Sequence, residues 1–303
     1  MSGAENPGAH PLVRQALADG WAACAAEGAP PERPFAQGTS AILYVVPAVR
    51  GQALPGVLKI PVYHRRPPDW YSGLERDLLR EARLLRKYAC VSLPRLFAVD
   101  ARGRYLCREY VAGPALSALP VWRDAATLAV VLRALFAMTR ELFARFHDAP
   151  RGCLVIRDLK PENLVLAEDL RAVRLIDVAA ARREGDAHSA RHQAGVLGTG
   201  RRPYRPPEEL MGQRERFDRR LDYFAFGATA FFALTGRPPY DNREPDPDRV
   251  MAAYATQYAQ ALPELRGAAQ RAGLPGTTAE FLAACLHPQA GPRPRHFPGE
   301  DER

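Results

Sequence analysis

Hydrophobic residues change their periodicity along the chain. From Phe35 to about Ile60 the run AILYVV, a Gly/Pro turn in RGQALPG and the run VLKI predict a β-hairpin. The next segment, YSGLERDLLREARLLRKY, has Leu74, Leu78 and Leu85 at helical spacing on one face. Strand-like segments come next at LFAVD and RYLCREYV, and the chain then becomes helical, notably over residues 125–146. A β-rich first third with one helix, followed by a helical remainder, implies an α+β protein of two lobes.

The first 34 residues differ in character from the rest of the chain. They contain one helical pattern, PLVRQALADGWAACAAEG, and end in the Pro-rich stretch APPERP. We therefore expect an N-terminal extension and linker at residues 1–34, a small lobe at 35–112 and a larger helical lobe with a short tail at 113–303.

One acidic residue lies on the apolar face of the predicted helix. Glu81 shares its face with Leu74, Leu78 and Leu85. A carboxylate on a core-facing stripe is costly unless a cation meets it. The pattern therefore predicts a buried or half-buried Lys or Arg partner from elsewhere in the chain.

Composition narrows the class of protein. With 47% hydrophobic and 25% charged residues in 303, the chain is an ordinary globular protein, which excludes wholesale disorder, collagen and coiled coils. The net charge of +8 favours anionic partners such as nucleotide phosphate, nucleic acid or a membrane surface, although scattered Arg is equally typical of a solvated surface. No basic strip interleaved with aromatic residues accompanies it, so the sequence carries no clear nucleic-acid motif.

Cysteine usage and hydropathy indicate the compartment. The five cysteines are odd in number and widely spaced, without a C-x-x-C pair, so we expect reduced thiols and neither a disulfide framework nor a structural zinc site. The histidines likewise show no metal-ligand spacing and are interpreted as surface or packing residues. The longest apolar run, 225–234, is too short to span a membrane, and no signal peptide pattern opens the chain. We expect a cytoplasmic protein.

The most informative stretch is IRDLKPENLVL, residues 156–166, followed by RLIDVA at 174–179. Asp158 precedes Asn163 by five positions, Lys160 lies between them, and Asp177 comes nineteen residues after Asp158. This arrangement resembles the catalytic loop and metal-binding aspartate of the eukaryotic-type (Hanks-type) serine/threonine protein kinases, in a bacterial-looking member.

The resemblance implies a role for each of these residues. Phosphoryl transfer needs a carboxylate that orients the attacking hydroxyl and accepts its proton, here Asp158, and a cation that offsets phosphoryl charge, here Lys160. Asn163 and Asp177 would hold Mg²⁺ against the phosphates of ATP.

Further motifs appear in the order that the family has them, over residues 35–297. Lys59 in VLKI would hold the α- and β-phosphates, and Glu81 would pair with it, which supplies the cation that the helix pattern requires. Beyond the catalytic loop, YRPPE, LDYFAFG and CLHPQAGPRPR are similar to the end of the activation segment and to two later helix motifs. In them Asp222 would brace the catalytic loop, and Arg293 would pair with Glu208.

The nucleotide-binding segments depart from the family pattern. In AQGTSAILY only Gly38 remains of three glycines that cover the phosphates. In LCREYVAG the backbone from Glu109 to Val111 would hydrogen-bond adenine. The residue beside the adenine pocket is Arg108, or Cys107 if the register differs by one, and both alternatives remain open.

Two other departures concern the chemistry and its control. Ile156 replaces a packing histidine, and the metal-binding motif is Asp177-Val178-Ala179. Arg157, next to Asp158, is of the kind that receives a phosphate on the activation segment, where the candidate hydroxyls are Ser189, Thr199 and Tyr204.

We therefore expect a serine/threonine protein kinase that uses ATP and Mg²⁺, acts on a protein hydroxyl and autophosphorylates. One alternative is a pseudokinase that binds nucleotide or protein as a scaffold, favoured by the degenerate glycine loop. Another is a small-molecule kinase resembling the aminoglycoside or lipopolysaccharide-sugar phosphotransferases. No motif encodes the identity of the substrate.

Overall fold

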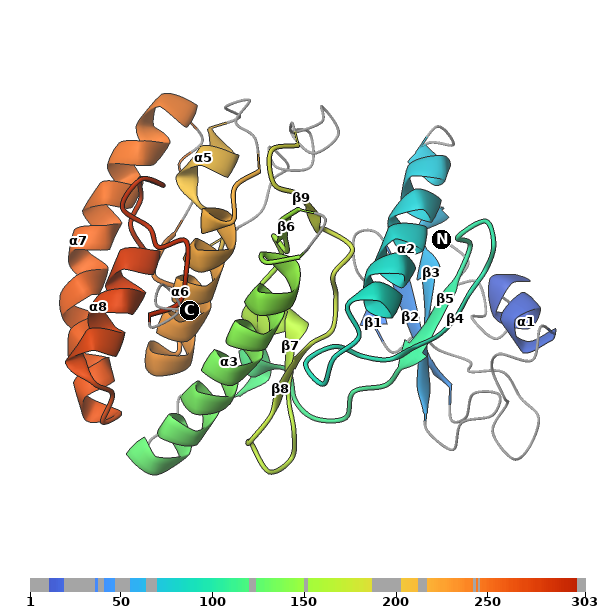
Figure 1. Cartoon of the computed structure of the whole chain (residues 1–303), viewed down its shortest axis with the longest axis horizontal. Coiled ribbons are helices and arrows are strands. Elements are labelled where there is room, and N and C mark those ends of the chain that lie inside the picture. The colour runs from blue at the N-terminus through green and yellow to red at the C-terminus, as the bar shows by residue number, and fades with distance from the viewer. Residues whose placement is uncertain are drawn as a thin grey trace, which may run out of the picture. The chain divides into compact units, whose positions relative to one another are not determined.

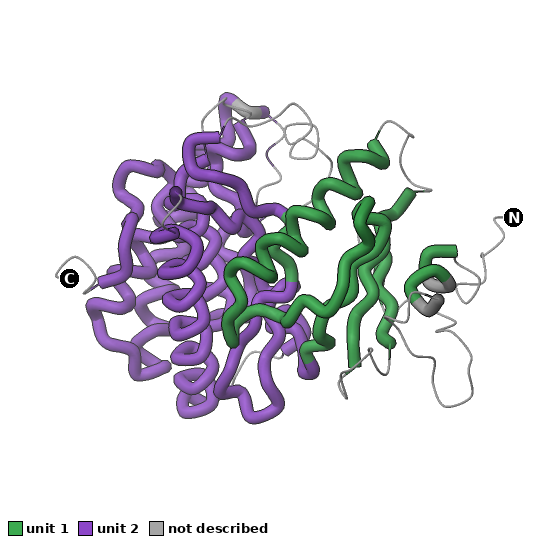
Figure 2. The backbone as a smooth tube through the Cα atoms, turned by 45° about the vertical axis from the view of Figure 1, so that its right-hand side comes forward, with its two compact units in different colours: residues 1–111, 177–179 green, residues 112–176, 180–303 purple. Residues whose placement is uncertain are grey.

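The structure of the chain is a computed structural model. It describes residues 11–18, 36–37, 41–46, 55–63, 70–119, 124–149, 152–186, 203–211, 217–241, 244 and 246–298. Two compact units divide the chain, and Figure 2 distinguishes them by colour. Unit 1 comprises Met1–Val111 with the short segment Asp177–Ala179, and unit 2 comprises Ala112–Ile176 with Ala180–Arg303.

Unit 1 is built on a five-stranded antiparallel sheet of order β1-β2-β3-β5-β4 (Figure 1). Its strands are β1 (Ala36–Gln37), β2 (Ala41–Val46), β3 (Gly56–Pro61), β4 (Leu96–Val99) and β5 (Leu106–Glu109). The predicted hairpin is confirmed as β2 and β3, which pair from Ala41 opposite Pro61 to Val46 opposite Gly56. The strand-like segments LFAVD and RYLCREYV are confirmed as β4 and β5.

Helix α2 (Tyr71–Lys87) packs on this sheet through the predicted apolar face. Leu78 and Ala82 form one buried cluster with Leu106 of β5, and Leu96 and Val99 of β4 pack against it. Glu81 is buried on the same helix. The turn between β4 and β5 passes so close to α2 that a side chain at Gly103, where φ is +77°, would meet the carbonyl oxygen of Glu75.

A second cluster of unit 1 includes part of the predicted N-terminal extension. Helix α1 (Pro11–Ala18) brings a fully buried Ala16 and a partly buried Leu12 to a core that contains Leu58 and Ile60 of β3 and Cys107 of β5. Helix α1 thus belongs to the core of unit 1.

Unit 2 is mainly helical. Its helices are α3 (Ala125–Phe146), α5 (Pro207–Leu210), α6 (Arg220–Thr235), α7 (Pro247–Arg271) and α8 (Gly276–Cys285). Helix α6 is buried on nearly all sides by α3, α7 and α8 (Figure 1), which explains its lack of a polar face. Gly227 permits the close approach of α8, because a Cβ there would lie 2.7 Å from the Cβ of Cys285.

Short strands and turns of unit 2 support the loop that resembles a catalytic loop. Strand β6 (Leu154–Val155) pairs with β9 (Arg182–Arg183), and β7 (Leu164–Leu166) pairs with β8 (Val173–Leu175). The 3₁₀ turns η4 (Leu116–Ala118) and η5 (Pro161–Asn163) lie beside each other. Residues 156–163 are therefore held between β6 and β7. No helix in the described part of the chain is long and apolar enough to cross a membrane.

Candidate active site

A buried lysine of β3 joins two carboxylates of unit 1. Lys59 Nζ donates to Glu81 Oε2 at 2.7 Å and to Asp177 Oδ2 at 2.8 Å. Lys59 is 5% exposed and Glu81 is fully buried. The predicted cationic partner of Glu81 is therefore confirmed, and the segment Asp177–Ala179 brings a second carboxylate to the same ammonium group.

Electrostatics keep this lysine charged. Burial alone would lower the pKa of Lys59, but the carboxylates of Asp177 and Glu81 outweigh burial and raise the pKa above its ordinary value. Burial would raise the pKa of Asp177, and Lys59 more than offsets this, so the pKa of Asp177 is lowered. For Glu81 burial dominates, and its pKa is raised although Lys59 opposes the change. The pair of Lys59 and Asp177 is thus stabilised in its ionised form.

The carboxylate of Asp177 is also oriented by its own backbone. Asp177 Oδ1 accepts a hydrogen bond from the Ala179 amide at 2.9 Å, while Val178 is buried. The Ala179 amide therefore fixes the orientation of this carboxylate.

Three polar side chains of the loop after β6 converge in unit 2. Lys160 Nζ donates to both carboxylate oxygens of Asp158 at 2.9 Å. Asn163 Nδ2 donates to Asp158 Oδ2 at 2.8 Å and to the Asp158 carbonyl oxygen at 2.9 Å. The short spacing along the chain thus becomes a cluster in which one carboxylate is oriented by a cation and an amide.

Asp222, in the first turn of α6, anchors the same loop through its backbone. Its carboxylate is fully buried and accepts hydrogen bonds from the amides of Ile156 and Arg157, both at 2.7 Å. This is the bracing contact that the resemblance implies. Arg157 has a φ of +73°, a strained value for a residue with a side chain, and the two bonds to Asp222 hold it there.

His147 is a residue of this site that sequence reasoning did not identify. It comes directly after α3, is 3% exposed, and places Nε2 2.8 Å from Asp222 Oδ2. The interpretation of His147 as a packing residue accounts for its burial but not for this contact. A separation of 75 residues carries no local signal that could have revealed the pair.

Arg157 already has an acidic partner. Its Nε and Nη2 donate to Glu209 Oε1 at 3.2 Å and 3.0 Å, and both side chains are almost completely buried. The guanidinium also lies over the Phe217 ring, 4.3 Å from its centroid, and Arg205 approaches the other oxygen of Glu209 at 3.6 Å. The Glu209 carboxylate thus binds the Arg157 guanidinium, which the sequence analysis expected to bind a phosphate.

Of the three candidate phosphorylation sites, the structure describes one, Tyr204. Ser189 and Thr199 lie outside the described residues. Tyr204 is half-buried, and burial raises the pKa of its hydroxyl. Its neighbour in sequence, Glu208, receives two hydrogen bonds from Arg293 at 2.5 Å and 3.0 Å, as the resemblance implies.

The segment assigned to adenine continues β5. Glu109 is held by Arg95, whose backbone amide donates to Glu109 Oε2 at 3.0 Å, and the Tyr110 amide donates to the Pro55 carbonyl oxygen. Val111 is half-buried, and Gly38 lies outside the described residues. The roles of Gly38, Glu109 and Val111 remain predictions.

The register of β5 places Arg108 and Cys107 on opposite faces of the sheet. Leu106 lies opposite Lys59 and Arg108 opposite Val57, so Arg108 is on the face of the sheet that carries Lys59. Cys107 is on the other face, in the cluster that includes α1. Arg108 therefore shares a face with Lys59, which forms the Lys59 cluster together with Glu81 and Asp177.

The residues proposed to hold a metal ion carry suitable donors. Mg²⁺ prefers oxygen ligands and retains water or phosphate oxygens for the rest of its shell. Asn163 uses Nδ2 for its contacts with Asp158, which directs its amide oxygen elsewhere, and Asp177 contributes a carboxylate. Among the described residues no group of three or more His, Cys, Asp and Glu side chains could hold a metal by themselves. The metal-binding roles of Asn163 and Asp177 remain predictions.

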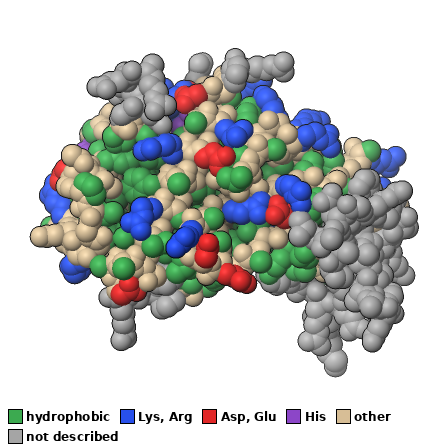
Figure 3. Space-filling view, turned by 60° about the horizontal axis from the view of Figure 1, so that its bottom comes forward, with side chains coloured by type: hydrophobic (Ala, Val, Ile, Leu, Met, Phe, Trp, Pro, Cys, Tyr) green, Lys and Arg blue, Asp and Glu red, His purple; other side chains and the backbone are tan. Residues whose placement is uncertain are grey.

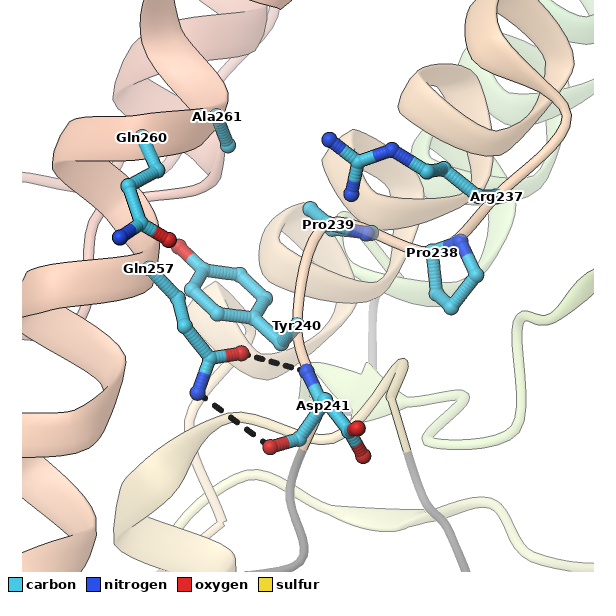
Figure 4. Close-up of a pocket in the computed structure, with 8 residues that line it drawn as sticks. All are labelled: Arg237, Pro238, Pro239, Tyr240, Asp241, Gln257, Gln260 and Ala261. Carbon is cyan, nitrogen blue, oxygen red and sulfur yellow. Dashed lines mark hydrogen bonds between the residues drawn. The ribbon is translucent and has the colours of Figure 1, made fainter.

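A separate cavity lies on unit 2 between the loop after α6 and helix α7 (Figure 4). It has a volume of about 330 Å³ and is lined by Arg237, Pro238, Pro239, Tyr240, Asp241, Gln257, Gln260 and Ala261. Its amide side chain Gln257 is bonded to the Asp241 backbone, and the Tyr240 hydroxyl donates to the Leu286 carbonyl oxygen. None of the residues that the sequence singled out for chemistry lines this cavity.

On the face drawn in Figure 3 the basic side chains do not gather into one patch. Figure 3 shows Lys and Arg side chains scattered over one face, with Asp and Glu among them. The buried cations Lys59, Arg108, Arg157 and Arg293 are instead each placed near carboxylates.

Comparison with known proteins shows the family to which the chain belongs. A family model described as protein kinase domain matches residues 64–296. The chain is 31% identical to serine/threonine-protein kinase pkn2 of Myxococcus xanthus over 196 residues, which is 61% of this chain and 22% of that protein. It is 30% identical to serine/threonine-protein kinase PknK of Mycobacterium tuberculosis over 184 residues, which is 60% of this chain and 14% of that protein. The chain thus spans less than a quarter of the length of these relatives.

A solved structure shows the same fold. The kinase PK-1 of the Cydia pomonella granulovirus aligns with a TM-score of 0.56 at 16% identity, covering 86% of this chain and 88% of that one. The α+β arrangement of a β-rich unit and a helical unit is therefore shared with a solved kinase structure.

Proposed function

Because the chain belongs to the protein kinase domain family, we propose that it is a serine/threonine protein kinase that transfers the γ-phosphate of ATP to a protein hydroxyl. The observation that carries the proposal is Lys59, whose buried ammonium group is bonded to both Glu81 and Asp177. A buried lysine held charged by two carboxylates is suited to binding the phosphates of a nucleotide. The cluster of Asp158, Lys160 and Asn163 supplies the second half of the machinery.

Asp158 is the proposed acceptor of the substrate proton. As the hydroxyl oxygen bonds to the γ-phosphorus, the bond from that phosphorus to the β,γ-bridging oxygen breaks and ADP leaves. The hydroxyl proton passes to the Asp158 carboxylate. Asn163 and Lys160 orient this carboxylate, and Lys160 offsets negative charge on the phosphoryl group being transferred.

Lys59 is proposed to bind the α- and β-phosphates. Glu81 receives one of its hydrogen bonds and is anchored in α2, so the ammonium group is positioned before any nucleotide arrives. Such preorganisation lowers the cost of reorganisation during the reaction.

Asn163 and Asp177 are proposed to hold Mg²⁺ through their side-chain oxygens. When bound, Mg²⁺ neutralises phosphate charge. The Ala179 amide keeps the Asp177 carboxylate in a fixed orientation for this role.

The substrate class is inferred from the family and its motifs. Lys160, two residues after Asp158, and the P-P-E segment favour a Ser or Thr hydroxyl on a protein. The pseudokinase and the small-molecule kinase are not favoured, because the chain has the full set of ionic residues and the ion pair of Glu208 and Arg293. We place the reaction in the cytoplasm, because it consumes ATP and the described cysteines are free thiols.

The test is phosphoryl transfer from radiolabelled ATP, in the presence of Mg²⁺, to a generic basic protein and to the chain itself. Asp158→Asn keeps the shape of the side chain and removes the base, so labelling should fall by about 100-fold or more. Asp148→Asn is the matched control, because Asp148 is a solvent-exposed aspartate of the same unit. Unchanged labelling by D158N would refute the proposed mechanism, and absence of labelling by the wild-type chain would refute the proposed activity.

A further inference from the structure

Arg108 is a buried cation of unit 1 that the proposed mechanism does not use. It is only 3% exposed and lies on β5 opposite Val57, two residues along β3 from Lys59. Residues two apart on a strand share a face, so Arg108 and Lys59 are on the same face of the sheet. The Nη1 atom of Arg108 donates to the Glu109 carbonyl oxygen at 3.4 Å, at the start of the segment assigned to adenine.

The surroundings of Lys59 contain more negative than positive charge if Arg108 is left out. Glu81 and Asp177 are both bonded to the single ammonium group of Lys59. The second oxygen of Glu81, Oε1, is buried and accepts no hydrogen bond from the described residues. One lysine therefore faces two carboxylates, that of Glu81 fully buried and that of Asp177 about one-third exposed.

Arg108 acts on both of these carboxylates. Burial raises the pKa of Glu81, and Arg108 is one of the two cations that oppose this change. Arg108 also contributes, after Lys59, to the lowered pKa of Asp177. A guanidinium can be buried only where carboxylates or dipoles replace its hydration. Arg108 has the Glu109 carbonyl as a hydrogen-bond acceptor, and the strand register puts it on the sheet face of Lys59, to which both carboxylates are bonded.

We propose that Arg108 is a second cation of the phosphate-binding site, which balances one of the two carboxylates so that the Lys59 cluster presents no net negative charge to a nucleotide. The inference rests on the proposed function, because it takes the phosphates of ATP to meet Lys59. Two cations and two carboxylates sum to zero, so an anionic ligand is not repelled even before a metal ion arrives. Without Arg108 the cluster carries one net negative charge, and it would repel a polyphosphate.

Repulsion by the cluster without Arg108 would weaken the binding of a charged ligand but not that of a neutral one. In a poorly solvated site the effect of one charge on another several ångströms away is large, so the loss of Arg108 should weaken binding of ATP. Adenosine carries no phosphate and should be unaffected. A residue that merely shaped the pocket would affect both ligands alike.

The experiment is calorimetric titration of the full chain with ATP in the presence of EDTA, and separately with adenosine. Arg108→Met should weaken metal-free ATP binding by about tenfold or more and leave adenosine binding within about twofold. Arg108→Lys restores the charge and should keep ATP affinity within about threefold of the wild type. The matched control is Arg83→Met, which removes an exposed arginine of the same unit.

Arg108→Gln provides a second neutral variant that keeps a polar side chain, and it replaces R108M in the comparison if that variant does not fold. Equal losses for ATP and adenosine, or undiminished ATP binding in a neutral variant, would overturn the proposal while leaving the proposed function standing. Failure of the wild-type chain to bind ATP with or without Mg²⁺ would instead refute the proposed function.

Discussion

Charged residues in the interior of this protein are arranged as compensated groups. Lys59 contacts two carboxylates, Asp222 accepts two backbone hydrogen bonds, and Arg157 is held by Glu209. Each group would be costly to bury alone, and each becomes tolerable because its partner replaces the lost hydration. Removing one member therefore has a larger effect than removing both.

Variants of Lys59 and Glu81 can test whether losing one member of a buried ion pair costs more stability than losing both. Lys59→Met should lower the free energy of unfolding by about 3 kcal/mol, because it leaves the fully buried carboxylate of Glu81 without its closest cation. The double variant K59M/E81Q should regain part of this loss, since it removes the buried charge as well. Urea unfolding of the four proteins in the cycle measures the coupling, and a double variant no more stable than K59M would contradict the interpretation.

Elements of unit 1 are linked by short polar turns as well as by apolar packing. Asp100, which comes directly after β4, accepts hydrogen bonds from the backbone amides of Arg102 and Arg104 and from the Arg104 guanidinium. These bonds close the turn between β4 and β5, in which Gly103 adopts its positive φ. The closed turn lies against α2.

The Asp100 turn predicts a pH dependence. The Arg104 side chain, against the opposing effect of burial, lowers the pKa of Asp100 below its usual value of 3.8. A lowered pKa means that the folded state favours the carboxylate. The stabilisation is therefore fully present above pH 3.8 and is lost as the pH falls through the folded-state pKa.

Asp100→Asn should lower the free energy of unfolding by about 1 kcal/mol at pH 7 and by less as the pH approaches the folded-state pKa. Thermal unfolding across the acidic range measures the difference between variant and wild type. A difference that does not shrink at low pH would show that the turn is not stabilised by the ionised carboxylate.

At the scale of the whole molecule, one contact between residues far apart in the sequence bears on whether the kinase needs phosphorylation to be active. Arg157, which follows β6, and Glu209 of α5 are 52 residues apart and are joined by hydrogen bonds within unit 2. Phosphorylation orders many kinases by supplying an anion to an arginine of this kind. Here a carboxylate already occupies that place.

Activity should therefore survive removal of phosphate. Phosphatase-treated wild-type protein, with its phosphate content determined by intact mass, should retain initial rates within about twofold of the untreated protein. Glu209→Gln should lower the free energy of unfolding by about 3 kcal/mol, because it leaves Arg157 buried without a charged partner. Glu168→Gln, which changes an exposed glutamate of the same unit, is the control.

A large loss of rate after dephosphorylation, restored by incubation with ATP, would show that Arg157 awaits a phosphate despite its contact with Glu209. Phosphopeptide mapping after incubation with ATP and Mg²⁺ would then identify the modified hydroxyl among Ser189, Thr199 and Tyr204.

Features that depend on neighbours along the chain could be predicted from local sequence patterns. Short-range periodicity predicted the hairpin, the face of α2 that carries Glu81, and the bounds of α3. Motif order and spacing singled out Asp158 and Asn163. Even the need for a cation at Glu81 was predictable, because the cost of a buried charge does not depend on where its partner comes from.

Contacts between residues far apart in the sequence could not be predicted in this way. The packing of helices and loops determines that His147 contacts Asp222 and that Arg157 pairs with Glu209. The strand register determines which face of the sheet carries Arg108. No periodic pattern encodes such pairs, because a side chain's partner is set by which elements pack together. A shift of one residue in strand register would have exchanged Arg108 for Cys107.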